Sequence, residues 1–209
     1  KDAMTALEID EAASPPNDAA VAEDLICLGE VYFLKKRLSE REPLYRRALE
    51  LLINKMGEEH YLVSECMNNL ASALQDARRM DEAEALYERS IRISEKVLPP
   101  DDHEPGVWLN NLGTLLSETG RKNDAEAAYR RSLVIFERSR TPNHPQFAIS
   151  LLNLAGILKT TGRKKEALEF GKRALAIRET SLGLVHEETI NAMWNVLNLM
   201  LPAEDLSEL

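Results

Sequence analysis

An apolar triplet recurs along the chain at a fixed interval, and this repeat constrains the fold more than any other feature of the sequence. Each central residue has one apolar partner three positions earlier and another four positions later. The central residues stand 42 positions apart, at Leu28, Leu70, Leu112, Leu154 and Val196. Apolar residues at i, i+3 and i+7 form one face of an amphipathic α-helix. The sequence therefore predicts five equivalent helices, each opening a repeat.

A second helical pattern follows each of the first four predicted helices. Three of these begin with a capping box, in which a polar N-cap residue precedes a glutamate by three positions: Ser39 and Glu42, Asp81 and Glu84, Asn123 and Glu126. Small residues and Tyr45, Tyr87 and Tyr129 then recur in register. Small residues let two helices approach closely, and the aromatic ring fills the space beside them. We therefore expect an all-α fold, a right-handed solenoid of antiparallel helix pairs.

The internal spacing of the repeat distinguishes among families of helix pairs, which include armadillo and HEAT repeats. Leu112-Gly113, Ala125, Tyr129 and Ser132 stand at offsets that resemble the tetratricopeptide repeat (TPR). With Asn-Asn-Leu before the core and a histidine loop before each first helix, the sequence resembles the 42-residue class found in kinesin light chains and nephrocystin-like proteins. This resemblance implies a TPR superhelix that serves as a non-enzymatic scaffold for protein or peptide partners.

The same period predicts the domain organisation. Residues 1–201 are expected to form a single TPR domain, and residues 202–209 a C-terminal tail. Within the domain we expect the tail of an upstream repeat at 1–13, repeats near 20–60, 61–103, 104–144 and 145–186, and a final first-type helix at 187–201.

Composition and motifs exclude several classes of function. The chain has 26 Lys and Arg against 35 Asp and Glu, a net charge of −9, which argues against binding to a nucleic-acid backbone. It has no apolar run of the roughly 18 residues that a membrane helix requires. Catalytic and cofactor-binding motifs are absent from the sequence, so we expect no enzyme activity and no cofactor. The two cysteines, Cys27 and Cys66, lie far apart in sequence; we expect buried or half-buried thiols in a reducing, cytoplasmic compartment.

Four histidines near the same period raise the question of a metal site. They are His60, His103, His144 and His186, each in the loop before a first helix. Neighbouring helices pack about 8–10 Å apart, so successive loops are expected to lie too far apart to share one ion. We predict no metal site and a structural role, in which the histidines hydrogen-bond the start of the next helix.

The candidate binding residues stand just before the central leucines. An amide side chain has both a donor and an acceptor, which suits a peptide bond. The TPR resemblance implies that these amides line a concave groove of first helices and bind an extended peptide; the alternative is a ladder in which each amide satisfies a neighbouring repeat. Both interpretations stay open. The candidates are Asn68, Asn69, Asn110, Asn111, Asn153 and Asn195, with Trp194 beside the last, whereas the first repeat has Cys27 at this position.

Acidic residues outnumber basic ones on the same predicted face. The acids are Glu23, Glu30, Glu65, Asp76 and Glu118, and the one base is Lys159. TPR proteins that bind terminal carboxylates or acidic cargo motifs use Lys and Arg there. We therefore predict a neutral or basic partner segment, bound with help from Glu65, Asp76 and Glu118. Two alternatives remain: a spacer or self-association segment of a larger solenoid, and the sensor or targeting arm of a multidomain protein.

Overall fold

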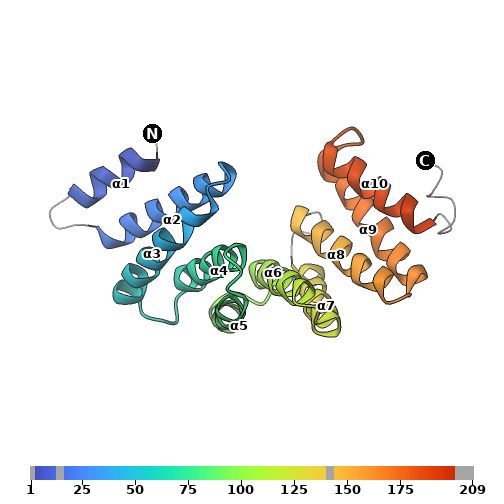
Figure 1. The fold of residues 1–209 in the computed structure, drawn as a ribbon, viewed down its shortest axis with the longest axis horizontal. Coiled ribbons are helices and arrows are strands. Elements are labelled where there is room, and N and C mark those ends of the chain that lie inside the picture. The colour runs from blue at the N-terminus through green and yellow to red at the C-terminus, as the bar shows by residue number, and fades with distance from the viewer. Residues whose placement is uncertain (1–2, 13–16, 140–143, 201–209) are drawn as a thin grey trace. The chain divides into compact units, whose positions relative to one another are not determined.

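The computed structural model describes residues 3–12, 17–139 and 144–200, which form α-helices joined by short loops (Figure 1). The chain divides into two compact units, Lys1–Pro99 (unit 1) and Pro100–Leu209 (unit 2). Unit 1 contains α1 (Ala3–Ala12), α2 (Asp18–Leu34), the 3-10 helix η1 (Leu38–Glu40), α3 (Arg41–Met56), α4 (Tyr61–Asp76) and α5 (Met80–Val97). Unit 2 contains α6 (Glu104–Glu118), α7 (Lys122–Arg138), α8 (Pro145–Thr160), α9 (Lys164–Leu182) and α10 (Glu187–Met200).

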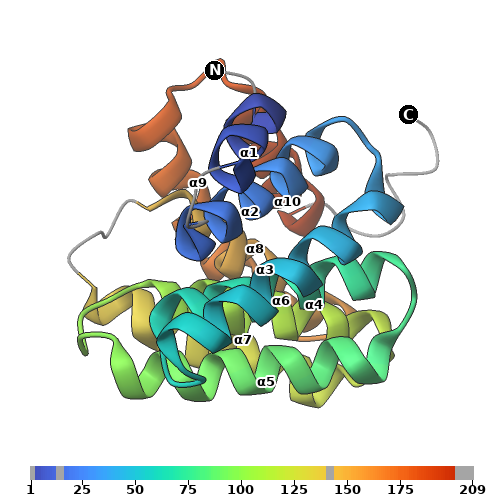
Figure 2. The same cartoon turned by 90° about the vertical axis from the view of Figure 1, so that its left-hand side faces the viewer.

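The helices pair as the repeat predicts. In unit 1, α2 packs on α3 and α4 on α5; in unit 2, α6 packs on α7 and α8 on α9 (Figures 1 and 2). The five predicted first helices are α2, α4, α6, α8 and α10, and the central residue of each is buried. The described residues contain no strand, which confirms the all-α class. Among these helices none is long and apolar enough to cross a membrane.

The termini and the domain division are only partly described. Helix α1 packs on α2. That this segment is the tail of an upstream repeat stays a prediction. Leu201 and the predicted tail 202–209 lie outside the described residues. That residues 1–201 form a single domain stays a prediction.

In two repeats a glycine on the first helix and a tyrosine on the second helix recur at the same spacing, and the close approach of the two helices explains this pattern. A Cβ atom on Gly113 would lie 2.6 Å from Cε1 of Tyr129, and one on Gly29 would lie 2.5 Å from Cε1 of Tyr45. Both tyrosine rings are buried. The small residue on the first helix therefore makes the space that the ring of the second helix fills.

The predicted capping boxes are wrong. Asp81 and Asn123 lie inside α5 and α7, whose N-cap residues are Arg79 and Arg121, and neither cap makes a side-chain hydrogen bond to the helix. Helix α3 likewise starts after Glu40, without a side-chain cap and later than Ser39. The chain enters each of these helices through a turn with a left-handed residue, such as Arg78 at φ 63°.

Two of the three glutamates of these boxes, Glu42 and Glu126, are bound by arginines. Arg79 pairs with Glu82, three residues on, and also donates to Glu42 of the preceding repeat at 2.5 Å. In the same way, Arg163 donates to Glu126 at 2.7 Å. A charge-assisted hydrogen bond to guanidinium is stronger than one to a neutral backbone amide, so these carboxylates turn towards the next repeat.

The histidine loops confirm the structural role. Nδ1 accepts from a backbone amide two residues on in three of them: His60 from Leu62 at 3.2 Å, His144 from Gln146 at 3.3 Å, and His186 from Glu188 at 3.2 Å. In the other loop Asp102 takes this position and accepts from Glu104 at 2.9 Å. The described residues contain no group of three or more side chains that could hold a metal.

One detail of the histidine prediction is wrong. The imidazole rings of His103 and His144 lie with centroids 4.3 Å apart, so these successive loops do bring their histidines together. His103 stands one residue beyond the capping position that Asp102 fills, and its ring lies beside Phe136 and His144. The distance between helix axes therefore sets no lower limit on the distance between loop side chains.

Candidate partner-binding surface

In unit 2 the candidate asparagines lie on the first helices α6 and α8. Nδ2 of Asn153 donates to Oδ1 of Asn110 at 2.9 Å, so one amide pair links two successive repeats. Asn110 is only 4% exposed, while Asn111 and Asn153 are half-buried. This contact is of the kind that the ladder interpretation predicts. It joins Asn153 to Asn110, however, and not to Asn111, which is the residue one period before Asn153.

The last candidate amide lies on α10 and does not extend this pair. Nδ2 of Asn195 donates to the carbonyl of Asn191 in the same helix, at 3.1 Å. Its neighbour Trp194 is 56% exposed, whereas Trp108 is 1% exposed. Trp194 is therefore the more exposed of the two tryptophans, and its part in partner binding stays a prediction.

In unit 1 the equivalent amides are on α4. Asn68 is buried, Asn69 is half-buried, and Nδ2 of Asn68 donates to Oδ1 of Asn69 at 3.3 Å. The neighbouring first helix α2 has Cys27 in place of the second amide. This thiol is exposed, so the prediction of a buried or half-buried Cys27 is wrong; Cys66 is buried, and burial raises the pKa of its thiol to about 12.

Carboxylates surround Cys27 on α2 and α4. Partial burial raises the pKa of the Cys27 thiol, and the negative charges of Glu30, Asp24, Glu23 and Glu65 raise it further. We refer to these four carboxylates as the α2–α4 acidic patch. Negative charges close together oppose the ionisation of a neighbouring acid, which raises the pKa of the thiol. The same negative charges attract positively charged groups of a partner.

Asp24 is a member of this patch that the sequence analysis missed. Its pKa is raised by burial and then by Asp10 and Glu23, so the patch continues from α2 towards α1. In the sequence, the only hint that Asp24 belongs to the patch is that it follows Glu23. Adjacent residues on a helix point in different directions, so this hint is weak. The packing of α1 on α2 brings Asp10 near Asp24, and the sequence does not show that packing.

Asp76 is one of the acids counted on this face, and it pairs with a base that the count over first helices did not include. Nη1 of Arg41 lies 2.5 Å from Oδ2 of Asp76, and Nη2 lies 3.4 Å from Oγ of Ser72. The guanidinium is buried beside the rings of Phe33 and Tyr45. Arg41 comes from the second helix of the preceding repeat, which a charge count over first helices omits.

The remaining predicted charges are at the ends of first helices in unit 2. Glu118 is exposed at the end of α6, and Lys159 is exposed near the end of α8. Residues of unit 1 and unit 2 therefore form separate candidate surfaces: the acidic patch with Asn68 and Asn69, and the amide-bearing face with Asn110, Asn111 and Asn153.

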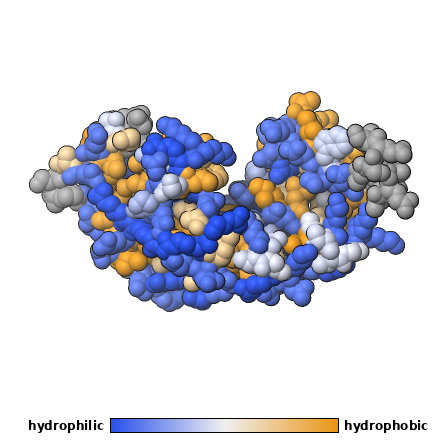
Figure 3. Space-filling view, viewed as in Figure 1, coloured by the Kyte–Doolittle hydropathy of each residue, from blue (hydrophilic) through white to orange (hydrophobic). Residues whose placement is uncertain are grey.

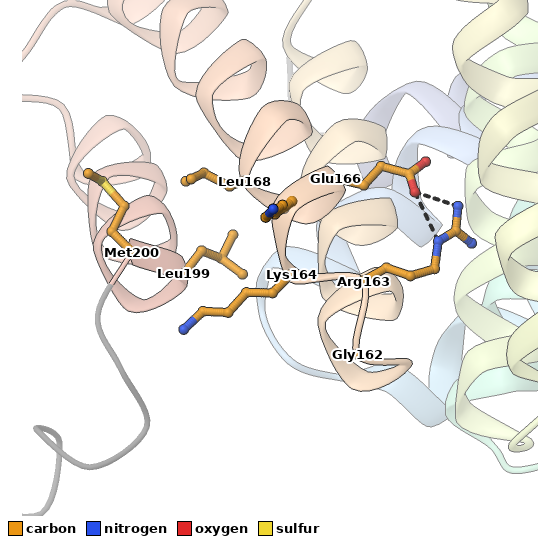
Figure 4. A pocket seen from close by; sticks show the side chains of 8 residues that line it. Gly162, Arg163, Lys164, Glu166, Leu168, Leu199 and Met200 are labelled. Atoms are coloured by element: carbon orange, nitrogen blue, oxygen red, sulfur yellow. Dashed lines mark hydrogen bonds and ion pairs between the residues drawn. The ribbon is translucent and has the colours of Figure 1, made fainter.

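In unit 2, a hollow of about 800 Å³ lies between the start of α9 and the end of α10 (Figure 4). Lys164 and Lys165 line it together with Leu199 and Met200. Figure 4 shows Arg163 turned towards Glu166, with which it pairs, while Lys164 extends alongside Leu199. The hollow therefore combines apolar walls with a basic edge.

Solved structures with the same fold include kinesin-light-chain-like proteins. The structure of BtubC (BKLC) from P. vanneervenii is similar with a TM-score of 0.78 and 22% identity, over 94% of this chain and 80% of that chain. A Podosopora anserina protein described as a kinesin light chain with nearly identical TPR-like repeats is similar with a TM-score of 0.71 and 19% identity, over 85% and 84%. No curated protein sequence matches this chain.

A family model described as tetratricopeptide repeat matches residues 18–96, 65–138 and 104–180. These overlapping matches cover most of the chain and contain the helix pairs from α2 to the larger part of α9. Repeats of this family are generally protein–protein interaction scaffolds, and the fold is typically non-enzymatic. The chain belongs to the tetratricopeptide repeat family.

Proposed function

We propose that this chain is a non-enzymatic scaffold that binds an extended or helical segment of a partner protein on its first helices. The observation that carries the proposal is the α2–α4 acidic patch, in which Glu23 and Glu30 are exposed on α2 while Asp24 on α2 and Glu65 on α4 are half-buried. The sequence analysis predicted Glu23, Glu30 and Glu65 to lie on the partner-binding face. A patch of one sign of charge steers and selects a segment of the opposite sign.

The amides beside the patch support main-chain recognition. Asn69 is half-buried on α4, next to Asn68, and Asn111 and Asn153 have the same exposure in unit 2. An amide side chain carries both a donor and an acceptor, so it suits the N–H and C=O groups of a peptide bond. Amides held in place by contacts within the fold lose less side-chain entropy when a partner binds.

The partner segment is expected to be basic rather than neutral where it meets unit 1. The buried Arg41 pairs with Asp76, and we assign selectivity to the acidic patch formed by Glu23, Glu30 and Glu65 with their neighbour Asp24. In this proposal the protein acts in the cytoplasm and binds neither nucleic acid nor membrane, because its excess of acid repels phosphate groups.

The experiment uses peptides selected from a random display library on the folded chain, with affinities measured by fluorescence anisotropy at low and high salt. The test variant is Glu23→Gln/Glu30→Gln/Glu65→Gln. Three lost charge contacts of ordinary surface strength are expected to weaken binding of the selected peptides about tenfold at low salt. High salt should reduce this difference, because it screens the attraction.

A matched control removes three acids from second helices of the same unit, in Glu50→Gln/Asp81→Asn/Glu88→Gln. These residues are exposed on α3 and α5, and the change in net charge is the same. The control is expected to change affinity less than about twofold. Selected peptides without an excess of Lys and Arg, or an equal loss in both variants, would reject the α2–α4 acidic patch as the recognition surface.

A further inference from the structure

Helix α10 has an apolar stripe that no second helix covers among the described residues. Ile190 and Leu197 are seven residues apart, as are Met193 and Met200, and Trp194 flanks them. We call these five residues the α10 seam. Four of them are exposed, Leu197 by 41%, and together they line an apolar hollow of about 420 Å³. Two interleaved sets at a seven-residue interval are the a and d positions along which two helices pack.

In the other repeats the equivalent face is covered by the second helix of the same pair. The residues equivalent to Leu197 are small and buried: Gly29, Ala71, Gly113 and Ala155. Those equivalent to Ile190 are also small and buried: Ala22, Ser64, Gly106 and Ala148. Small residues at both places let the second helix approach closely.

The α10 seam has large side chains at both of these places. At the position equivalent to Leu197, even a Cβ on Gly113 would lie 2.6 Å from the ring of Tyr129. At the position equivalent to Ile190, a Cβ on Gly106 would lie 3.2 Å from Phe136. A second helix of the kind that α7 represents therefore does not fit on α10. The occupant must be a helix that packs at the wider distance of about 8–10 Å, with side chains interdigitating.

The apolar surface extends into the loop before α10. Hydrophobic side chains gather over the α9–α10 loop in Figure 3, where Leu184 and Val185 are exposed. The equivalent loop positions in the second repeat are Glu58 and Glu59. Large exposed apolar patches on a protein surface mark sites of association, and this one is confined to the last helix and its loop.

The charges at the two ends of the α10 seam are opposite. Glu187 is exposed at the first residue of the helix, and Lys165 lines the basic hollow beside Met200 at the other end. The helix has 14 residues, so these ends lie about 20 Å apart along its axis. Two antiparallel copies of α10 would bring Glu187 of each copy near Lys165 of the other.

From this self-complementary pattern we infer that the α10 seam is the interface of a homodimer in which two copies of the chain pack their α10 helices antiparallel about a two-fold axis. Such an interface is isologous, so each contact between two different residues occurs twice. Two-fold symmetry of this kind is the commonest symmetry among oligomers. It shares no residue with the α2–α4 acidic patch and does not depend on the function proposed above.

Sedimentation velocity of the whole chain, from about 1 to 300 µM, tests the dimer in the range where small interfaces associate. The wild-type chain is expected to shift from monomer to dimer, and Leu197→Asp and Trp194→Glu to remain monomeric with unchanged far-UV circular dichroism. The matched control is Leu34→Asp, which places the same charge on a 77% exposed residue of α2 and should dimerise normally. A wild-type monomer throughout, or dimers of both seam variants, would overturn the inference.

The antiparallel arrangement has its own test. Glu187→Lys and Lys165→Glu should each raise the dissociation constant of the dimer several-fold, because each puts like charges together at both ends of the interface. The double variant restores opposite charges and should recover an affinity close to the wild type. A double variant weaker than either single variant would reject antiparallel α10 packing.

Discussion

The amide pair between Asn110 and Asn153 gives the sharpest test of what the repeated asparagines do. The two side chains are 2.9 Å apart, and Asn110 is almost fully buried while Asn153 is half-buried. Replacing Asn153 by Ala leaves the Oδ1 atom of Asn110 without this donor, which costs about 1–3 kcal/mol of the free energy of unfolding. Replacing Asn110 by Ala leaves the half-buried amide of Asn153, which can turn towards water. This variant is expected to lower the free energy of unfolding by about 0.5–1.5 kcal/mol.

The double variant separates the pair contact from the two single losses. Once both partners are gone no buried acceptor lacks a donor, so the combined loss should fall short of the sum by about 1 kcal/mol. The assay is urea unfolding followed by tryptophan emission, because Trp108 is buried in α6, the helix that carries Asn110. This probe follows unit 2 even if the chain unfolds in more than one step.

Asn195→Ala is the matched control for this cycle. Its amide is exposed and bonds to a carbonyl of its own helix, so the expected change is within about 0.5 kcal/mol. Single variants at Asn110 and Asn153 whose effects simply add would refute the reasoning. The pair would then contribute nothing specific to folding, and both amides would be available to a peptide.

Two further predictions concern unit 2. Burial, and then His103, lower the pKa of His144 below 6.5, so the folded state should lose stability as the pH falls from 6.5 through this lowered value. His144→Asn keeps an acceptor for the helix cap and should flatten that part of the pH profile of thermal unfolding; an unchanged slope would mean that another group titrates. Gly156→Ala, with no atom within 4 Å of the new Cβ, should raise the free energy of unfolding in urea by about 0.5–1 kcal/mol. Gly113→Ala should lower it by about 1–2 kcal/mol because the new atom meets Tyr129 at 2.6 Å, and equal effects at the two glycines would contradict the close-approach argument.

The fold could be predicted because the residues that determine it recur at a fixed interval along the sequence. The triplets around Leu70 and Leu112 show which face is buried, and the offset between Gly113 and Tyr129 shows how the second helix packs on it. Both signals arise from contacts within one repeat, where the spacing in sequence determines the spacing in space. The starts of the second helices were harder, because Asp81 and Asn123 are good N-cap residues that tertiary contacts override.

The candidate surfaces were predicted less completely, for a physical reason. Compensation of Asp76 depends on Arg41, which lies 35 residues earlier and on a second helix. Pairing of Asn153 with Asn110 instead of Asn111 depends on the stagger of α6 against α8. Neither the direction of a long side chain nor the stagger of two helices follows from a residue's place in the period, so charge and amide counts need the packed structure.

Successive repeats are also joined by ion pairs between second helices, and this affects how the asparagines are interpreted. Arg79 with Glu42 and Arg163 with Glu126 bridge residues 37 positions apart, and each arginine also binds an acid three residues on. Exposed pairs of this kind contribute at most about 1 kcal/mol each, but their fixed register matches each repeat to the next. Because that matching takes place on the second helices, the amides of the first helices are less constrained by folding wherever no partner amide lies opposite. The ion pairs therefore give the repeats a means of registration that does not use the first-helix amides, and the first-helix face stays the partner surface that we propose even though Asn110 and Asn153 bind each other.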